Sequence, residues 1–144
     1  MANIIPDAFK SELLSGTHNF ASGGDTFKIA LYVTTLGPPY TTSSTVYSTT
    51  NEVSSSGTGY TTGGQTLDSQ AVSVPGSNTA IVDFANEVFS SVTLTSLGAA
   101  IYNSTNGSKL CLVIDFGGDK VATSGDFTIQ FPAATAGAAI IRVA

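Results

Sequence analysis

The side chains that most often perform catalysis or hold metals are scarce in this chain. His18 is the only histidine and Cys111 the only cysteine among 144 residues. A serine or cysteine nucleophile would have to use His18, and no motif surrounds a candidate nucleophile. One histidine and one cysteine cannot assemble a zinc site with His and Cys ligands within one chain. We therefore interpret His18 as a hydrogen-bonded linker residue and Cys111 as a small buried hydrophobe, the usual state of a free cysteine.

Three carboxylates, Asp115, Asp119 and Asp126, are close enough in sequence to meet at one end of a sheet. Calcium takes oxygen ligands, and glycine-containing turns can supply carbonyls. The spacing matches no calcium loop, so turn capping is the favoured interpretation. Glycoside hydrolysis needs two carboxylates that flank the substrate, and nothing in the sequence pairs two of them.

Two further motifs lack the partners that would give them chemistry. Asp115-Phe116-Gly117 matches the metal-binding triplet of protein kinases, but no phosphate-covering glycine loop and no His-Arg-Asp loop accompany it. Residues 57–64 are glycine-rich but lack the Lys-Ser/Thr of a phosphate-binding loop. The first motif is typical of a strand that ends in a glycine turn, and the second of a tightly turning loop. The sequence predicts no enzyme, no cofactor and no metal site.

Composition narrows the possible partners. Charged residues make up 10% of the chain, and serine and threonine together about a quarter, whereas a typical domain has about 25% charged residues. The net charge is −5 and the few cations are scattered, so nucleic acid and anionic membranes are not expected partners. No apolar run approaches a membrane span of about 20 residues, and the first residues lack the pattern of a signal peptide. We expect synthesis in the host cytoplasm.

The elements that must position these residues are mainly strands. Apolar and β-branched runs separated by turn signals recur at short spacing. They predict an all-β, jelly-roll-like β-sandwich of about eight strands. Asn106-Gly107 supplies the positive φ angles of a two-residue type I′ hairpin turn. The expected strands are residues 26–33, 66–74, 79–84, 89–95, 99–103, 109–116, 126–131 and 139–143.

The remaining segments predict one helix and one long loop. Pro6 can begin a helix that runs to Leu14, and Gly16 can end it. We expect residues 1–25 to form an N-terminal arm with this short helix, and residues 26–144 a single sandwich domain. Residues 40–65 are rich in Ser, Thr and Gly and predict a long surface loop.

Three segments could contact other molecules. The N-terminal segment is too apolar to remain in solvent, and the loop carries isolated tyrosines, which are favoured at interfaces. The end strand, residues 139–143, could be an open sheet edge. The candidate partner-binding residues are Ile4, Ile5, Phe9, Leu13, Leu14, Phe20, Tyr40, Tyr47 and Tyr60.

Longer patterns cover most of the chain. They include FSSVTLT (89–95), GAAIYN (98–103), VIDFGGDK (113–120), GDFTIQFP (125–132) and AAIIRV (138–143), with DTFKIALY (25–32), NEV (51–53) and GTGYT (57–61) upstream. In these stretches the chain resembles small virion structural proteins of tailed bacteriophages. The resemblance implies an all-β fold, assembly on a particle and no catalytic residue.

The resemblance implies a capsid decoration (cement) protein on the capsid surface of the virion. Its partners would be the major capsid protein and further copies of itself, as a homotrimer, because capsids offer local three-fold positions. One alternative is a head- or tail-fibre module that recognises the host surface through residues 40–65. A small cell-wall hydrolase is a second alternative, disfavoured because histidine, cysteine and paired acids are scarce.

Overall fold

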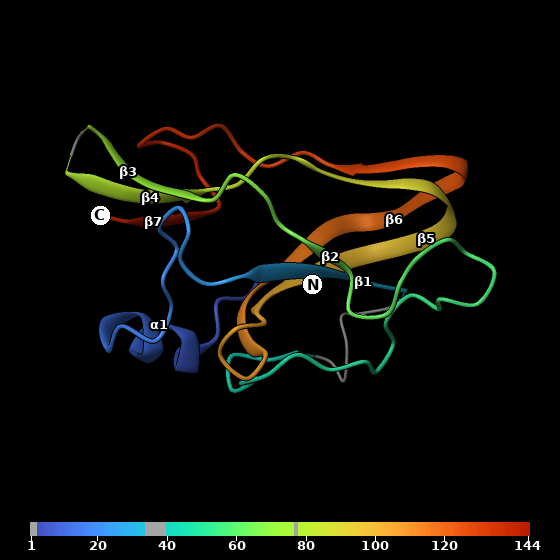
Figure 1. Ribbon diagram of the computed structural model, residues 1–144, viewed down its shortest axis with the longest axis horizontal. Helices are drawn as coiled ribbons and strands as arrows, with labels where there is room; N and C mark the ends of the chain where they lie inside the picture. The colour runs from blue at the N-terminus through green and yellow to red at the C-terminus, as the bar shows by residue number, and fades with distance from the viewer. Residues whose placement is uncertain (1–2, 34–39, 77) are drawn as a thin grey trace.

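A computed structural model describes residues 3–33, 40–76 and 78–144. This part of the chain is mostly β-structure and contains one short helix (Figure 1). No helix in it is long and apolar enough to cross a membrane. The elements are α1 (Asp7–Leu14), β1 (Phe27–Tyr32), β2 (Gln65–Thr66), β3 (Ala71–Gly76), β4 (Thr79–Asp83), β5 (Glu87–Asn103), β6 (Lys109–Ile129) and β7 (Ile141–Val143).

Two antiparallel sheets form the two layers of a sandwich. One has the order β2-β1-β5-β6 and the other β3-β4-β7. In Figure 1, β5 and β6 bend at the end away from α1 and continue into the second layer. The main core lies between the layers and includes Phe27, Ile29 and Leu31 of β1 with Phe89 and Phe127 of the hairpin. The predicted all-β sandwich with a short N-terminal helix is confirmed.

Strand β1 is buried on both faces, although its alternation predicted a half-buried strand. Ala30 and Tyr32 belong to a second, smaller cluster with Tyr40, Tyr102 and Val113. Ile4 and Tyr47 pack against this cluster. The second face is therefore covered by the N-terminal segment and the long loop, two coil segments that periodicity does not reveal.

The β5–β6 hairpin replaces four predicted strands with two long ones. Its register shifts where Ser96 and Gly98 of β5 pair with Lys120 and Asp115 of β6. One residue of β5 therefore faces four residues of β6, 116–119, which form a bulge. Gly117 and Gly118 have φ of 75° and 151°, conformations that residues with a Cβ rarely adopt. Bulges bend strands, so the predicted glycine turn is a corner within one strand. The described part of the chain has seven strands.

The tip of this hairpin is wider than a two-residue turn. Asn103 pairs with Lys109, which leaves residues 104–108 as the loop. Positive φ falls on Gly107 and Ser108 rather than on Asn106 and Gly107. The Asn103 side-chain oxygen accepts hydrogen bonds from the backbone N–H groups of Thr105 and Asn106, and these hold the wider loop. The predicted type I′ geometry is wrong, and the predicted position of the hairpin is right.

The predicted strand at residues 66–74 is divided into β2 and β3. Between them Ser69 has a φ of 56°, and the Gln70 side-chain amide donates to the carbonyls of Ala21 and Asp25. These side-chain bonds tie the chain to the N-terminal segment and interrupt the ladder.

Helix α1 and the segment around it belong to the sandwich rather than to a separate arm. Pro6, in an extended conformation, precedes the helix, and Gly16 follows it with a φ of 77°. Phe9 and Phe20 are buried in the main core, where Phe20 stacks on Phe27 with ring centroids 4.2 Å apart. Ile4 exchanges two backbone hydrogen bonds with Val113, of 2.9 and 2.8 Å. The expected boundary at residue 25 therefore does not separate an arm from a core.

Candidate functional site

The predicted partner-binding residues do not lie on one surface. Four of them, Phe9, Phe20, Tyr40 and Tyr60, are buried and contact the protein's own core. Their aromatic rings fill space between the coil segments and the sheets, so these four predictions of an external contact are wrong in this conformation. Ile4, Leu13 and Tyr47 are half-buried. The exposed members are Ile5 and Leu14, whose exposed fractions are 45% and 90%.

Glu52 organises the long loop, a role that no motif in the sequence indicated. Its carboxylate accepts hydrogen bonds from the hydroxyls of Tyr47 (2.5 Å) and Tyr60 (2.6 Å) and from the backbone N–H of Gly63 (2.7 Å). Tyr102 in turn donates to the Gly63 carbonyl at 2.6 Å. Partly buried bonds to the Glu52 carboxylate, which are charge-assisted and therefore of the stronger kind, hold the loop together. The bond from Tyr102 attaches the loop to the sheet.

The tyrosine hydroxyls of this network are held in their neutral form. Burial, reinforced by the nearby Glu52 carboxylate, raises the pKa of Tyr47 and of Tyr60. Burial and the Glu52 charge raise the pKa of Tyr102 to about 12. Tyr32 and Tyr40, which share a hydrogen bond of 2.8 Å, also have a raised pKa because they are buried. These hydroxyls act as structural hydrogen-bond donors and not as acids or bases.

A second polar network is buried around His18. The Asn103 amide donates to His18 Nδ1 (3.0 Å) and to Asp25 (2.8 Å), while its oxygen accepts from backbone N–H groups. Because Nδ1 accepts, the ring proton lies on Nε2 and is donated to Glu12 at 2.9 Å. Lys109 donates to the other Glu12 oxygen at 2.7 Å. The predicted hydrogen-bonded state of His18 is confirmed, but the residue lies in the core rather than in an exposed linker.

Cys111, His18 and Glu12 contact one another in turn, as the nucleophile, the base and the orienting carboxylate of a cysteine catalytic triad do. The Cys111 sulfur is 3.9 Å from His18 Nδ1. However, Cys111 has no exposed surface, and burial raises the pKa of its thiol far above the usual range. A thiolate is the reactive form, and a substrate cannot reach a fully buried sulfur. The arrangement supports packing, and the interpretation of Cys111 as a buried hydrophobe is confirmed.

The three carboxylates considered for calcium remain dispersed along the bend of β6. Asp115 accepts a hydrogen bond from the Gly117 N–H at 2.8 Å, which caps the bulge. Asp126 accepts from the Ser91 N–H at 3.4 Å. Within residues 3–33, 40–76 and 78–144, no group of three or more His, Cys, Asp or Glu side chains could hold a metal ion.

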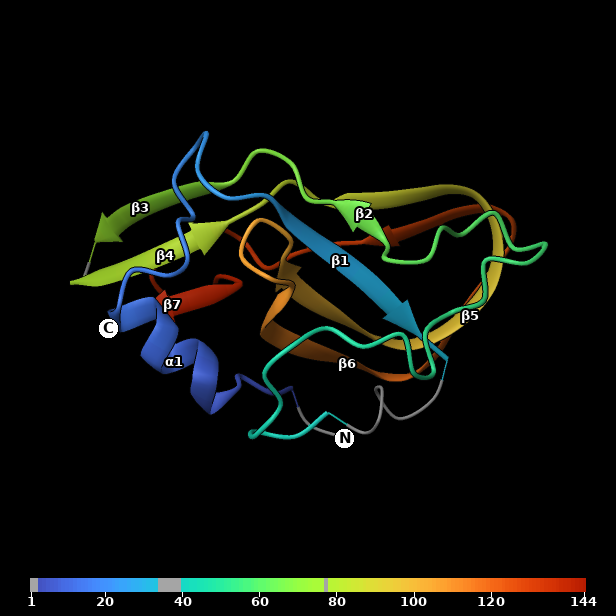
Figure 2. The same cartoon turned by 60° about the horizontal axis from the view of Figure 1, so that its bottom comes forward.

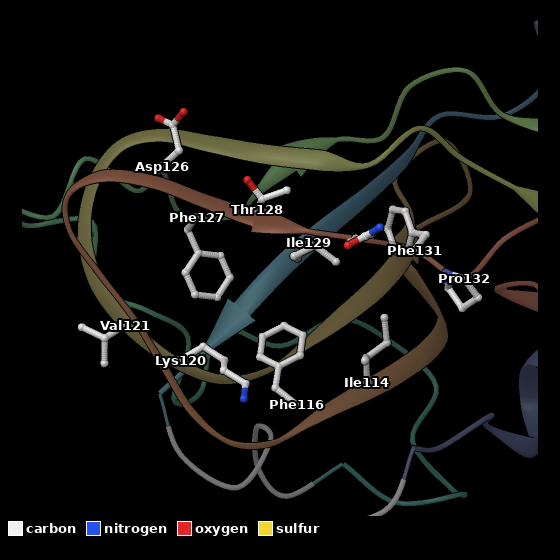
Figure 3. A pocket seen from close by; sticks show the side chains of 11 residues that line it. Ile114, Phe116, Lys120, Val121, Asp126, Phe127, Thr128, Ile129, Phe131 and Pro132 are labelled. Carbon is white, nitrogen blue, oxygen red and sulfur yellow. The ribbon is translucent and has the colours of Figure 1, made fainter.

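The surface of the described residues carries apolar depressions, two of which have volumes near 500 Å³. The first, which we call the hairpin cleft, has a volume of about 500 Å³ and lies inside the fold of the β5–β6 hairpin. Figure 3 shows Ile114 and Phe116 on one side of it and Phe127, Ile129 and Phe131 on the other. The rings of Phe116 and Phe127 point toward each other, with centroids 6.1 Å apart.

The second depression, which we call the α1 groove, has a volume of about 480 Å³ and lies between α1 and the β3-β4-β7 sheet. Figure 2 shows α1 beside β7 at the end of the molecule where β3 and β4 project. Leu13 and Leu14 form one wall and Val72, Ala80 and Val143 the other. Leu14, Val72 and Val143 are each more than half exposed. Contiguous exposed apolar surface of this kind marks contact sites.

Comparison of the chain with protein-family models, with curated proteins and with solved structures finds no match in any of the three. The class of protein is therefore defined by the fold and the site alone. It is an all-β sandwich whose accessible features are apolar depressions and hydroxyl-rich loops.

Proposed function

We propose that this chain is a structural protein of a tailed-bacteriophage virion that decorates and stabilises the capsid. The proposal is supported by the sequence patterns at residues 89–132 and by the all-β sandwich. The single observation that carries it is the α1 groove, an almost entirely apolar surface with Leu14 exposed by 90% at its edge. Burying such a surface releases about 25 cal/mol per Å² of apolar area.

The proposed mechanism is thermodynamic. A protein that binds only the assembled shell shifts the equilibrium toward that shell by mass action. Stable attachment requires about 800 Å² of contact on each partner. The α1 groove would supply the apolar centre of the contact with the major capsid protein. A homotrimer at local three-fold positions is the assembly that this proposal implies.

The test is co-sedimentation of the purified chain with expanded, empty capsids of the phage that carries it. Leu14→Asp is expected to weaken binding at least tenfold, because it places a charge at the edge of the apolar contact. Val121→Asp is the matched control, since Val121 is also an exposed apolar residue but lies on β6, outside the groove. Its binding should equal that of the wild type.

Two outcomes would contradict the proposal. Purified virions that lack the chain by mass spectrometry would remove the decoration role. Binding of the isolated chain to host cells, with none to capsids, would favour the fibre module instead.

A further inference from the structure

The hairpin cleft has the size of a small-molecule site. Its volume of about 500 Å³ falls within the range of roughly 300–1,000 Å³ that is typical of ligand pockets. Its floor consists of core side chains, including Phe127, Ile129 and Phe131, each no more than 8% exposed. The bulge at residues 116–119 folds β6 over itself and leaves this side of the sandwich open.

The walls of the cleft are apolar and mainly aromatic. Ile114 and Phe116 come from the first half of β6, and Phe127 and Ile129 from its second half (Figure 3). Such walls favour a hydrocarbon ligand, which gains about 0.8 kcal/mol of binding free energy for each CH₂ group that it buries. A volume of about 500 Å³ suits one ligand chain rather than a layer of lipids.

The charge at the rim of the cleft is positive. Lys120 extends beside Phe116 at the rim (Figure 3), and within the described part of the chain its ammonium forms no ion pair. The other charged residue at the rim, Asp126, directs its carboxylate away from the cleft and accepts a hydrogen bond from Ser91. A ligand that enters the cleft with its hydrocarbon part would meet an available cation at the mouth.

We propose that the hairpin cleft binds a single amphiphile with a hydrocarbon chain and one anionic head group, a free fatty acid. The chain packs along the apolar walls formed by Ile114, Phe116 and Ile129, and the carboxylate pairs with Lys120. This site is separate from the α1 groove and does not depend on capsid binding.

The test is calorimetric titration of the full chain with dodecanoate below its micelle concentration. We expect saturable binding of one molecule per chain. Dodecanol should bind at least fivefold more weakly, because it lacks the charge. Lys120→Ala should weaken dodecanoate binding about fivefold, the effect of one exposed ion pair, and should leave dodecanol binding unchanged.

Variants at the rim and elsewhere locate the site. Lys120→Glu reverses the charge at the exposed rim position and should weaken dodecanoate binding further than Lys120→Ala without disturbing the core. Lys10→Ala, on α1, and Leu14→Asp, in the α1 groove, should bind dodecanoate as the wild type does. None of these variants replaces a buried residue, so a change in dodecanoate binding would not reflect a loss of folding.

Three results would overturn the proposal. The first is the absence of saturable binding by the wild type. The second is equal binding of dodecanoate by the wild type, Lys120→Ala and Lys120→Glu. The third is binding to vesicles that contain anionic phospholipid, with none to monomeric dodecanoate, which would indicate a membrane surface instead of a free fatty acid.

Discussion

Glu12 and Glu52 each hold together segments that are distant in sequence. Glu52 receives hydrogen bonds from two tyrosines and one backbone N–H, and Glu12 receives them from His18 and Lys109. The Glu12 contacts join α1 to the start of β6, about 97 residues apart. Carboxylates are strong acceptors, so a chain with few charges uses two of them as half-buried attachment points.

The Glu12 network predicts a loss of stability in acid. Burial alone would raise the pKa of Glu12, but hydrogen bonds from Lys109 and His18 outweigh it, and the pKa lies below the ordinary value of 4.5. A carboxyl whose pKa is depressed by folding contributes stability above the unfolded pKa, and this contribution is lost as pH falls through the folded pKa. Glu12→Gln should therefore unfold more easily than the wild type at pH 7, by about 1–3 kcal/mol.

Urea unfolding at pH 7 and at several values below pH 4.5 measures this effect. The difference between the wild type and Glu12→Gln should shrink as the pH falls. Asp119→Asn, at an exposed acid, serves as the control and should change little. A difference that stays constant down to pH 2 would contradict the assigned role of the Glu12 charge.

At the scale of the element, the bend of β6 allows one hairpin to contribute to both layers of the sandwich. The four residues 116–119 face a single residue of β5, and the two glycines carry the unusual φ angles. Without the bulge, strands of 17 and 21 residues would continue as a flat ribbon and leave one face of each unpacked. The hairpin cleft exists because this corner is open on one side.

Gly118→Ala is expected to destabilise the protein by about 1–3 kcal/mol, because a φ of 151° is strained for a residue with a Cβ. Thermal or urea unfolding measures the effect. Gly125→Ala is the matched control: Gly125 lies in the same strand, outside the positive-φ region, and an added Cβ would make only ordinary contact with Thr123. Equal stability of the two variants would show that the bulge tolerates a side chain.

At the scale of the whole molecule, the N-terminal segment completes the sandwich. Phe9, His18 and Phe20 contact one another and Phe27, and they close the core at the end where α1 lies. The sequence led us to expect an N-terminal arm of residues 1–25 outside the sandwich domain. The structure indicates the opposite, because deleting residues 2–20 would remove three core rings and one hydrogen-bond partner of Asn103, His18.

Deletion of residues 2–20 is therefore expected to abolish cooperative unfolding and the near-ultraviolet circular dichroism of the folded chain. Phe9→Ala should cost about 3–5 kcal/mol, the usual effect of removing a core phenylalanine. Leu14→Ala, on the same helix but 90% exposed, should change stability by less than about 0.5 kcal/mol. A truncated chain that unfolds cooperatively would restore the arm as a separate unit.

The amino-acid sequence by itself determined the local elements of this protein. Alternating and β-branched runs defined the strands, and proline and glycine defined the ends of α1. The single His and Cys excluded a zinc site built only from His and Cys ligands within one chain. These features depend on neighbours in the chain, so periodicity and turn residues reveal them.

Only the tertiary structure decided what those elements do together. It buried Tyr40 and Tyr60, gave Glu52 its central position, joined four predicted strands into two, and placed Leu14 beside Val143. Each of these results depends on contacts between residues far apart in sequence. A residue of a given type can contact other molecules where it stays exposed, and it stabilises the core where another segment of the chain covers it.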